Sequence, residues 1–199
     1  MRRADSAIIL AGGKSSRMGF DKNQLVIDGV RLVDILSTAL LSLFAEVILV
    51  NNSPDFSPPD GVLVVSDELS GMGPLGGIHA GLKAAHSQYC LVTACDMPNI
   101  NLDYVKFMRE LLLEPGMDVT VLATRYRPHM EPFTAFYSRN LIRPIEDYCR
   151  GGGRGLNAFL SKQGVTLIEE CVARRFSPEW SMFANLNTPE EHRQYLLSR

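Results

Sequence analysis

Short apolar runs alternate along the chain with segments whose apolar residues recur at helical spacing. The runs have the length of strands and end at glycine, proline or polar residues. They are apolar throughout, which is typical of parallel strands covered on both faces. The expected strands comprise residues 7–10, 47–50, 62–65, 90–94, 118–124, 133–137 and 165–168. The strand at 133–137 could run in a different direction from the others.

Apolar positions between residues 32 and 44 follow the i, i+3, i+4, i+7 rule of an amphipathic helix. Further helices are expected from the end of the glycine-rich segment 70–81 through 85, over 101–113 and 156–162, and from Pro189 onward. The order strand–helix–strand predicts an α/β protein with a doubly wound, mostly parallel sheet. Because no repeat or linker divides the chain, residues 1–199 are expected to form a single domain.

Composition narrows the class of protein. The chain has 199 residues, 46% hydrophobic and 21% charged, with a formal net charge of −2, which is ordinary for a globular protein. The lack of a basic excess disfavours nucleic acid as a partner. No apolar run is long enough to span a bilayer, and the charged N-terminus precedes only a strand-sized run, so neither a membrane partner nor a signal peptide is expected. The expected location is the cytoplasm.

The four cysteines predict neither a metal site nor a disulfide framework. Cys90, Cys95, Cys149 and Cys171 lack the C-x-x-C spacing of zinc sites. Cys90 lies in an apolar run and Cys95 just after it, where buried cysteines act as small hydrophobes.

The first apolar run leads into a glycine-rich, cationic segment, residues 10–22, with the sequence Leu-Ala-Gly-Gly-Lys-Ser-Ser-Arg-Met-Gly-Phe-Asp-Lys. Its glycines allow sharp turns and close approach of a ligand. Lys14, Arg17 and Lys22 add positive charge, so the segment suits a polyphosphate. It is not a P-loop, because the residue five positions before Gly13 is Ile8, and no G-x-G-x-x-G occurs in the chain.

Polar residues follow three of the other expected strands. Asn51 (or its neighbour Asn52), Asp67 and Asp96 all come at strand ends, where ligands bind in open parallel sheets. Asp96 directly follows a buried run and precedes Met97-Pro98, so its carboxylate is a candidate magnesium ligand. The alternative for Asp96 is a carboxylate that hydrogen-bonds its own turn.

These motifs together resemble those of the molybdenum cofactor guanylyltransferases. The resemblance rests on L-A-G-G-x-S-x-R-M-G-x-D-K at 10–22, G-P-L-x-G at 73–77, C-D-x-P at 95–98 and N-x-N-T-P-E at 185–190, and it extends through most of the chain. It implies a Rossmann-like nucleotidyltransferase fold. It also implies transfer of GMP from GTP, with Mg2+ as cofactor, to molybdopterin, with release of pyrophosphate.

The resemblance assigns roles to individual residues. Arg17 and Lys22 would neutralise the triphosphate and, with the magnesium ligand Asp96, are the expected catalytic residues. In the C-terminal motif, Asn185 is the first and Asn187 the second candidate for an active-site residue, although Asn187 or Thr188 could also be no more than a helix cap. The residues expected at the donor nucleotide are Leu10, Ala11, Gly12, Gly13, Lys22, Asn51, Asp67, Gly76 and Asp96.

The acceptor side is less defined. Arg154, within Gly151-Gly152-Gly153-Arg154-Gly155, is a candidate for binding the molybdopterin phosphate, the alternative being a mobile surface loop. Glu131 stands directly before Pro132, where the family often has histidine. The residues that contact the pterin are therefore not defined by the resemblance. His79, on an apolar helix, is expected to be structural.

Two other functions remain open from the sequence. One is a related nucleotidyltransferase that uses CTP or another phosphorylated acceptor, such as a sugar phosphate. The other is a non-catalytic protein that binds the nucleotide or cofactor and delivers it. Expected partners are GTP and molybdopterin as substrates, and a molybdoenzyme or another cofactor-biosynthesis protein as a possible protein partner.

Overall fold

A computed structural model describes residues 3–12, 25–69, 71–126 and 128–198 of the chain. Its main sheet has seven strands in the order β5-β4-β1-β6-β8-β7-β9. The strands are β1 (Ser6–Leu10), β4 (Glu46–Val50), β5 (Leu63–Val65), β6 (Tyr89–Ala94), β7 (Val121–Tyr126), β8 (His129–Ser138) and β9 (Val165–Ile168), and a small hairpin pairs β2 (Val26–Ile27) with β3 (Val30–Arg31). The helices are α1 (Leu32–Leu41), α2 (Pro74–Ala84), α3 (Leu102–Leu113), α4 (Ile142–Arg150), α5 (Leu156–Leu160), α6 (Glu170–Ala173) and α7 (Pro189–Leu197), with 3-10 turns η2 (Arg139–Leu141) and η3 (Ser181–Phe183).

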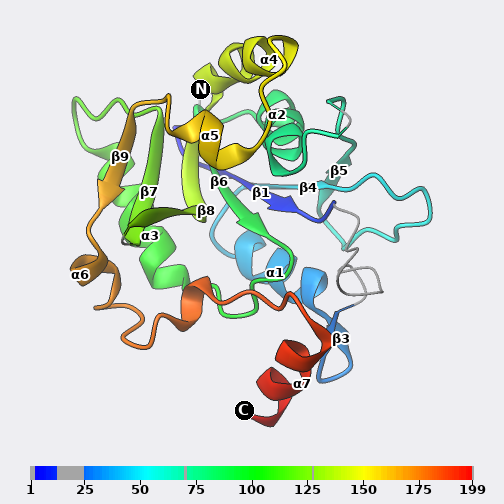
Figure 1. The fold of residues 1–199 in the computed structure, drawn as a ribbon. Coiled ribbons are helices and arrows are strands. Elements are labelled where there is room, and N and C mark those ends of the chain that lie inside the picture. Colours follow the sequence, from blue (N-terminus) through cyan, green and yellow to red (C-terminus); the bar gives the residue numbers. More distant parts are fainter. Residues whose placement is uncertain (1–2, 13–24, 70, 127, 199) are drawn as a thin grey trace.

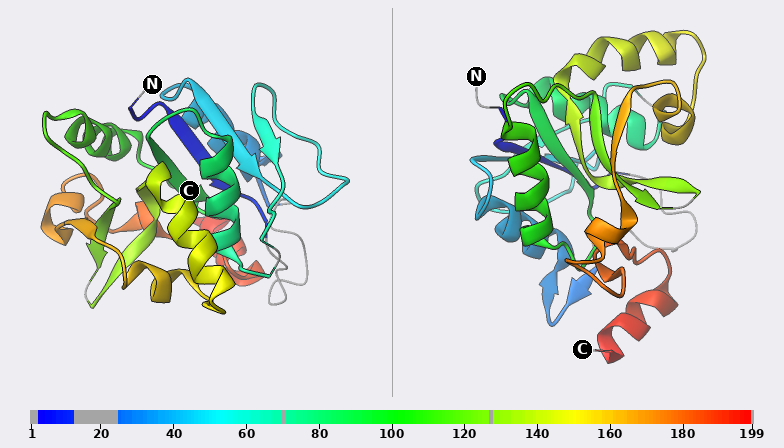
Figure 2. Two further views of the ribbon diagram at one scale, coloured as in Figure 1. Left: turned by 90° about the horizontal axis from the view of Figure 1, so that it is seen from above. Right: turned by 90° about the vertical axis from the view of Figure 1, so that its left-hand side faces the viewer.

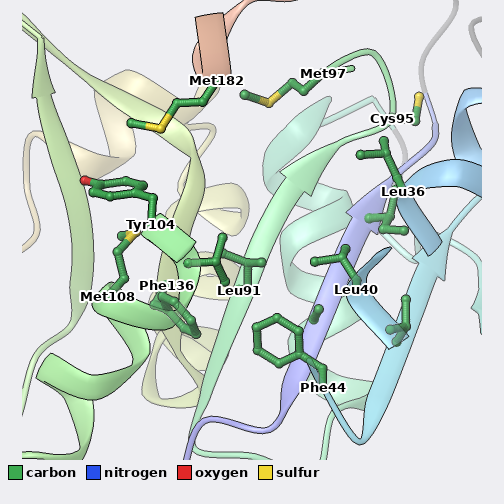
Figure 3. Packing of buried hydrophobic residues seen from close by; sticks show 14 of the residues in the cluster. Leu36, Leu40, Phe44, Leu91, Cys95, Met97, Tyr104, Met108, Phe136 and Met182 are labelled. Carbon is green, nitrogen blue, oxygen red and sulfur yellow. The ribbon is translucent and has the colours of Figure 1, made fainter. Parts of the chain in front are cut away.

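The sheet lies between two layers of helices, with α2, α4 and α5 on one face and α1 and α3 on the other (Figure 1). β1 is fully buried at the centre, and its successive side chains enter different cores. Ala7 and Ile9 belong to the core on the α1 and α3 side, whereas Ile8 and Leu10 belong to the core under α2. Figure 3 shows the first of these cores, with Leu36 and Leu40 of α1 and Tyr104 and Met108 of α3. Burial on both faces explains why β1 is apolar throughout, and the α/β class predicted from the sequence is confirmed.

Glycines bring α2 unusually close to β1. A Cβ on Gly81 would lie 2.6 Å from Cγ2 of Ile8, and a Cβ on Gly77 would lie 3.0 Å from Leu10 Cδ2. These positions are four residues apart and therefore lie on the same helix face. Part of the glycine-rich segment thus serves helix–sheet packing.

β8 is the strand that reverses direction. It pairs antiparallel with β6 and with β7, while β7 and β9 are parallel. The different direction suggested by the sequence for the strand at 133–137 is confirmed. The register between β7 and β8 shifts between Leu122 and Thr124. Opposite this irregularity, Thr134 has φ +53°, which is rare for a β-branched residue. The β7–β8 hairpin beyond it reaches the same edge of the sheet as the carboxyl ends of the parallel strands.

Several elements differ from the expectation. β5 is an edge strand whose Leu63 remains 47% exposed, so it is not covered on both faces. α4 was not predicted, although Pro144 stands at its third position, where a helix tolerates the missing N–H. The β2–β3 hairpin was not predicted either, and it turns at Asp28-Gly29, both with positive φ. Among the residues that the structure describes, no helix has the length and apolar character needed to cross a membrane.

Candidate active site

The carboxyl ends of β1, β4, β5 and β6 lie along one edge of the sheet, because these strands are parallel. Hydrogen bonding continues past the strand ends: Ala11 N–H donates to Val50 O (3.0 Å), and Cys95 N–H donates to Leu10 O (3.1 Å). The side chains of Leu10 and Ala11 are buried, whereas Gly12 is exposed. This stretch can therefore offer a ligand its backbone and not its side chains.

The two asparagines after β4 have different roles. Asn51 is buried, and its Oδ1 accepts a hydrogen bond from Ser53 N–H (2.7 Å). Its Nδ2 has no hydrogen-bond partner among the described residues. Asn52 is exposed, its Oδ1 accepts from Asp67 N–H (2.7 Å), and its Nδ2 would be 3.9 Å from a Cβ on Gly12. Asn52 therefore joins the end of β4 to the Asp67 loop, and its amide lies close to Gly12.

Asp67 lies directly against Gly76 in the first part of α2. A Cβ on Gly76 would overlap the Asp67 carboxylate, so no other residue fits at position 76 without moving Asp67. Asp67 Oδ1 accepts from Leu69 N–H (2.7 Å). Burial raises the pKa of Asp67, while the Leu69 hydrogen bond and the charge of His79 act in the opposite direction. The structure thus brings Asp67 and Gly76 into direct contact, which the motifs did not predict.

Asp96 follows β6 and is only 5% exposed. Its carbonyl oxygen accepts from Leu186 N–H (2.8 Å), so the C-terminal N-x-N motif packs beside it. Leu186 is buried and anchors this segment, and Asn185 before it is half-buried. Segments about ninety residues apart in the chain therefore meet at the end of β6.

Asn187 lies outside this contact in an exposed position. Its N–H donates to Glu191 Oε2 (2.6 Å). Thr188 is the N-cap of α7, and Thr188 and Glu191 form a reciprocal capping box. Of the two candidate caps, Thr188 and not Asn187 is therefore the N-cap of α7.

The glycine-rich loop before α5 is held by Tyr148 of α4. The Tyr148 hydroxyl donates to the Arg154 carbonyl (2.9 Å), and a Cβ on Gly153 would overlap the Tyr148 ring. Tyr148 in turn packs on Phe159 of α5, with ring centroids 5.3 Å apart. The backbone of this loop is thus fixed by the protein, while the Arg154 side chain is exposed.

A cluster of aromatic residues beside the β7–β8 hairpin was missed from the sequence. Trp180 stacks on Tyr126 (5.2 Å between centroids), and Arg174 lies 4.9 Å from the Trp180 ring. Glu131 of β8 is half-buried, and burial raises its pKa while Trp180 acts in the opposite direction. The sequence signal was weak: Trp180 is the single tryptophan, far along the chain from Glu131.

Three expected site residues, Gly13, Arg17 and Lys22, lie outside the described residues. Their roles remain predictions. In the described parts of the chain, no group of three or more His, Cys, Asp or Glu residues gathers in a way that could hold a metal ion. The four cysteines form no disulfide with one another in the described structure, and Cys90 and Cys95 are buried.

Solved structures show the class to which this fold belongs. The molybdopterin-guanine dinucleotide biosynthesis protein A of Archaeoglobus fulgidus superposes with a TM-score of 0.80 at 23% identity, covering 97% of each chain. The 2-C-methyl-D-erythritol 4-phosphate cytidylyltransferase of Thermus thermophilus superposes with a TM-score of 0.68 at 16% identity, covering 100% of this chain and 98% of that one. The fold is that of the α/β nucleotidyltransferases, as predicted.

The sequence comparisons identify the family. The model of the MobA-like NTP transferase domain matches residues 7–171, and the chain belongs to this family. It is 47% identical to the molybdenum cofactor guanylyltransferase of Syntrophotalea carbinolica, over 96% of this chain and 90% of that one. It is also 47% identical to a protein of Peptoclostridium acidaminophilum named "Probable molybdenum cofactor guanylyltransferase", over 96% and 87% of the two chains. The protein is therefore a nucleotidyltransferase enzyme, and the predicted family is confirmed.

Proposed function

We propose that this enzyme transfers GMP from GTP to molybdopterin, releasing pyrophosphate and forming the guanine dinucleotide cofactor. The observation that carries the proposal is the packing of Asp67 against Gly76, at the carboxyl edge of the sheet of a MobA-like transferase. The relatives at 47% identity bear the name of this activity.

Asp67 offers chemistry that suits guanine. A guanine base presents two adjacent donors, N1–H and the 2-amino group, and an ionised carboxylate accepts hydrogen bonds through both oxygens. A base contact at Gly76 also requires the absence of a side chain there, which the Asp67 contact already imposes. Cytosine presents a single amino donor beside an acceptor nitrogen and matches a carboxylate less well. Asp67 and Gly76 are thus proposed to select the base of the donor.

Asp96 is the proposed ligand of Mg2+. The donor set fits this ion, because Mg2+ takes one or two carboxylates and fills its remaining positions with water and substrate phosphates. A single buried carboxylate at the end of β6 meets that requirement. When bound, the ion supplies charge neutralisation at the phosphates.

The remaining proposed roles concern positioning. The backbone of Leu10, Ala11 and Gly12, with Gly13, would approach the nucleotide, and Arg17 and Lys22 would neutralise charge as pyrophosphate leaves. The Asn51 amide, Asn185 and Asn187 are proposed to orient the bound nucleotide. No general base is required, since a phosphate dianion of the acceptor is itself a nucleophile for in-line attack at the α-phosphate.

Thermal unfolding with GTP, CTP, ATP or UTP and magnesium tests the donor. A ligand that binds the native state stabilises it by about 1.4 kcal/mol for each tenfold excess over its dissociation constant. For a chain of this size, that corresponds to a rise of roughly 3–6 °C in the melting temperature. We expect the largest rise with GTP. An equal or larger rise with CTP would contradict the guanylyl assignment, and GTP binding without transfer to molybdopterin would indicate a non-catalytic carrier.

A further inference from the structure

The turn that begins at Asp96 is bound at both of its ends by the C-terminal segment, residues 181–197. Its first residue, Asp96, accepts a hydrogen bond from the main chain of this segment. Its last residue, Asn99, makes two further bonds with the same segment. Asn99 Nδ2 donates to Ser181 O (3.3 Å), and Asn99 Oδ1 accepts from the Tyr195 hydroxyl (2.9 Å). The turn that carries the proposed magnesium ligand is therefore held from a distant part of the chain.

α7, which supplies Tyr195, contacts the rest of the molecule through polar side chains. All nine of its residues are described and none is buried, and only His192 and Tyr195 are partly covered. These two residues are three positions apart and therefore lie on the same face of the helix. His192 Nε2 donates to Val26 O of β2 (2.8 Å). α7 accordingly lies beside the β2–β3 hairpin at one end of the molecule (Figure 2, right-hand view), with Tyr195 directed to Asn99.

α7 is stabilised at its start and not through burial. A helix of nine residues without a buried face is marginal on its own, and its capping box secures the first turn. The buried anchors of the C-terminal segment lie earlier, in η3 and at Leu186. Because these anchors already hold the segment against the core, the contact that α7 adds to the turn is that of Tyr195 with Asn99. The match to the MobA-like domain ends at residue 171, before this segment begins.

The position of the Asp96 main chain matters because of the ion proposed to bind there. Mg2+ demands near-ideal octahedral geometry, and a ligand side chain has to be held within about 0.5 Å of its productive position. The start of the turn is held next to β6, where Met97 N–H donates to Ala94 O (3.3 Å). Asn99 lies five residues past the last residue of β6, so its end of the turn depends on other contacts.

We propose that Tyr195 and Asn99 are positioning residues for Asp96, and that their hydrogen bond fixes the turn in the place where its carboxylate can hold Mg2+. This inference rests on the proposed function, in which Asp96 is the magnesium ligand. The two residues act through the turn, so their removal should weaken the contribution of the metal and leave binding of the nucleotide without metal intact.

The test compares the wild type with Tyr195→Phe and Asn99→Ala. Phenylalanine retains the ring, which packs against the core, and lacks only the hydroxyl. The dissociation constant of GTP is measured in EDTA and in excess magnesium, and the ratio of the two values gives the contribution of the metal. We expect this ratio to fall about 2- to 10-fold in Tyr195→Phe, the range for one lost hydrogen bond. Asn99→Ala should lower it at least as far, because the bond to Ser181 is lost too.

The dissociation constant of GTP in EDTA should stay at the wild-type value in both variants. Tyr89→Phe is the matched control, because it also removes a tyrosine hydroxyl that donates over 2.9 Å, here to Asp118. Tyr89 is the first residue of β6, at the opposite end of the strand from Asp96. Since this hydroxyl also accepts from Val119 N–H, Tyr89→Phe should lower the melting temperature at least as much as Tyr195→Phe. Its magnesium ratio should equal that of the wild type.

Asp96→Asn separates the two levels of the argument. If it lowers the magnesium ratio while Tyr195→Phe and Asn99→Ala leave the ratio unchanged, the positioning role is overturned and the metal site stands. An equal fall in Tyr89→Phe would also overturn the positioning role, because the ratio would then follow stability alone. A wild-type ratio in Asp96→Asn would contradict the metal site itself and, with it, this inference. Should Tyr195→Phe fail to fold, Asn99→Ala decides the matter from the other side of the bond.

Discussion

At the scale of single residues, Asp96 combines burial with the proposed role of a magnesium ligand. The main chain around it forms its own hydrogen bonds: Met97 N–H donates to Ala94 O (3.3 Å), and Leu186 N–H donates to Asp96 O (2.8 Å). Asp96→Asn retains these bonds and the size of the side chain, so we expect the variant to fold. Asp96→Asn should lower the rate of GMP transfer by about a hundredfold or more, the scale expected when one preorganised charge contact is lost. The measurement is the turnover number as a function of magnesium concentration.

Asp103→Asn is the matched control for this prediction. Asp103 is an exposed carboxylate on α3 that pairs with Lys106 (3.0 Å). Its side chain is exposed to solvent, unlike that of Asp96, so its removal should leave turnover unchanged. An Asp96→Asn enzyme that works at the wild-type rate under limiting magnesium would show that Asp96 only shapes its turn.

At the scale of elements, α2 depends on its close approach to β1. Gly81→Ala would place a Cβ 2.6 Å from Cγ2 of Ile8, a β-branched side chain buried in the central strand. Overpacking of this kind costs about 1–3 kcal/mol, while alanine gains at most about 1 kcal/mol of helix propensity over glycine. We expect a net loss of about 1–2 kcal/mol in the free energy of unfolding, measured by urea titration.

Gly164→Ala provides the comparison for α2. There a Cβ would have Thr120 Oγ1 at 3.9 Å as its nearest neighbour, which is ordinary contact. The free energy of unfolding should then change by less than about 0.5 kcal/mol. If Gly81→Ala proved as stable as the wild type, α2 and β1 would not be in the close contact that makes glycine necessary at position 81.

At the scale of the whole molecule, one continuous sheet carries the proposed donor site on its parallel strands, and the loop of Arg154 joins α4 to α5 on one face of the same sheet (Figure 1). This continuity supports the proposal that residues 1–199 form one domain. Arg154→Ala should raise the KM of molybdopterin about tenfold to a hundredfold, because a charge-assisted contact with a phosphate contributes roughly 1.5–3 kcal/mol to binding. The melting temperature should barely move, because Tyr148 holds this loop through the Arg154 carbonyl. The GTP-induced rise in melting temperature should stay the same.

Arg143→Ala, an exposed arginine at the other end of α4, is the control. It should leave the KM of both substrates unchanged. Weaker GTP binding in Arg154→Ala would assign Arg154 to the triphosphate instead, and unaltered kinetics for both substrates would return its loop to a purely structural role.

The sequence predicted those parts of the fold that depend on local pattern. β1 and β6 are apolar throughout because both of their faces are covered, and Asn101 caps α3 by accepting from Tyr104 N–H (2.9 Å). Both features can be recognised within a few residues of sequence: a cap by the type of its side chain, and a strand covered on both faces by its continuous apolar run. α4 and the exposure of β5 were missed, because they depend on what packs, or does not pack, against each element.

The sequence by itself determined the class of the molecule and the strand ends at which its polar residues lie. Their positions follow from apolar runs that stop at asparagine and aspartate, and parallel strands bring such ends to one edge. Only the tertiary structure decided which partner each residue has. The contact of Asp67 with Gly76, the link from Asn52 to Asp67 and the pairing of His79 with Glu146 join segments 9, 15 and 67 residues apart. Contacts across such separations depend on how helices pack on the sheet, and no local pattern specifies them.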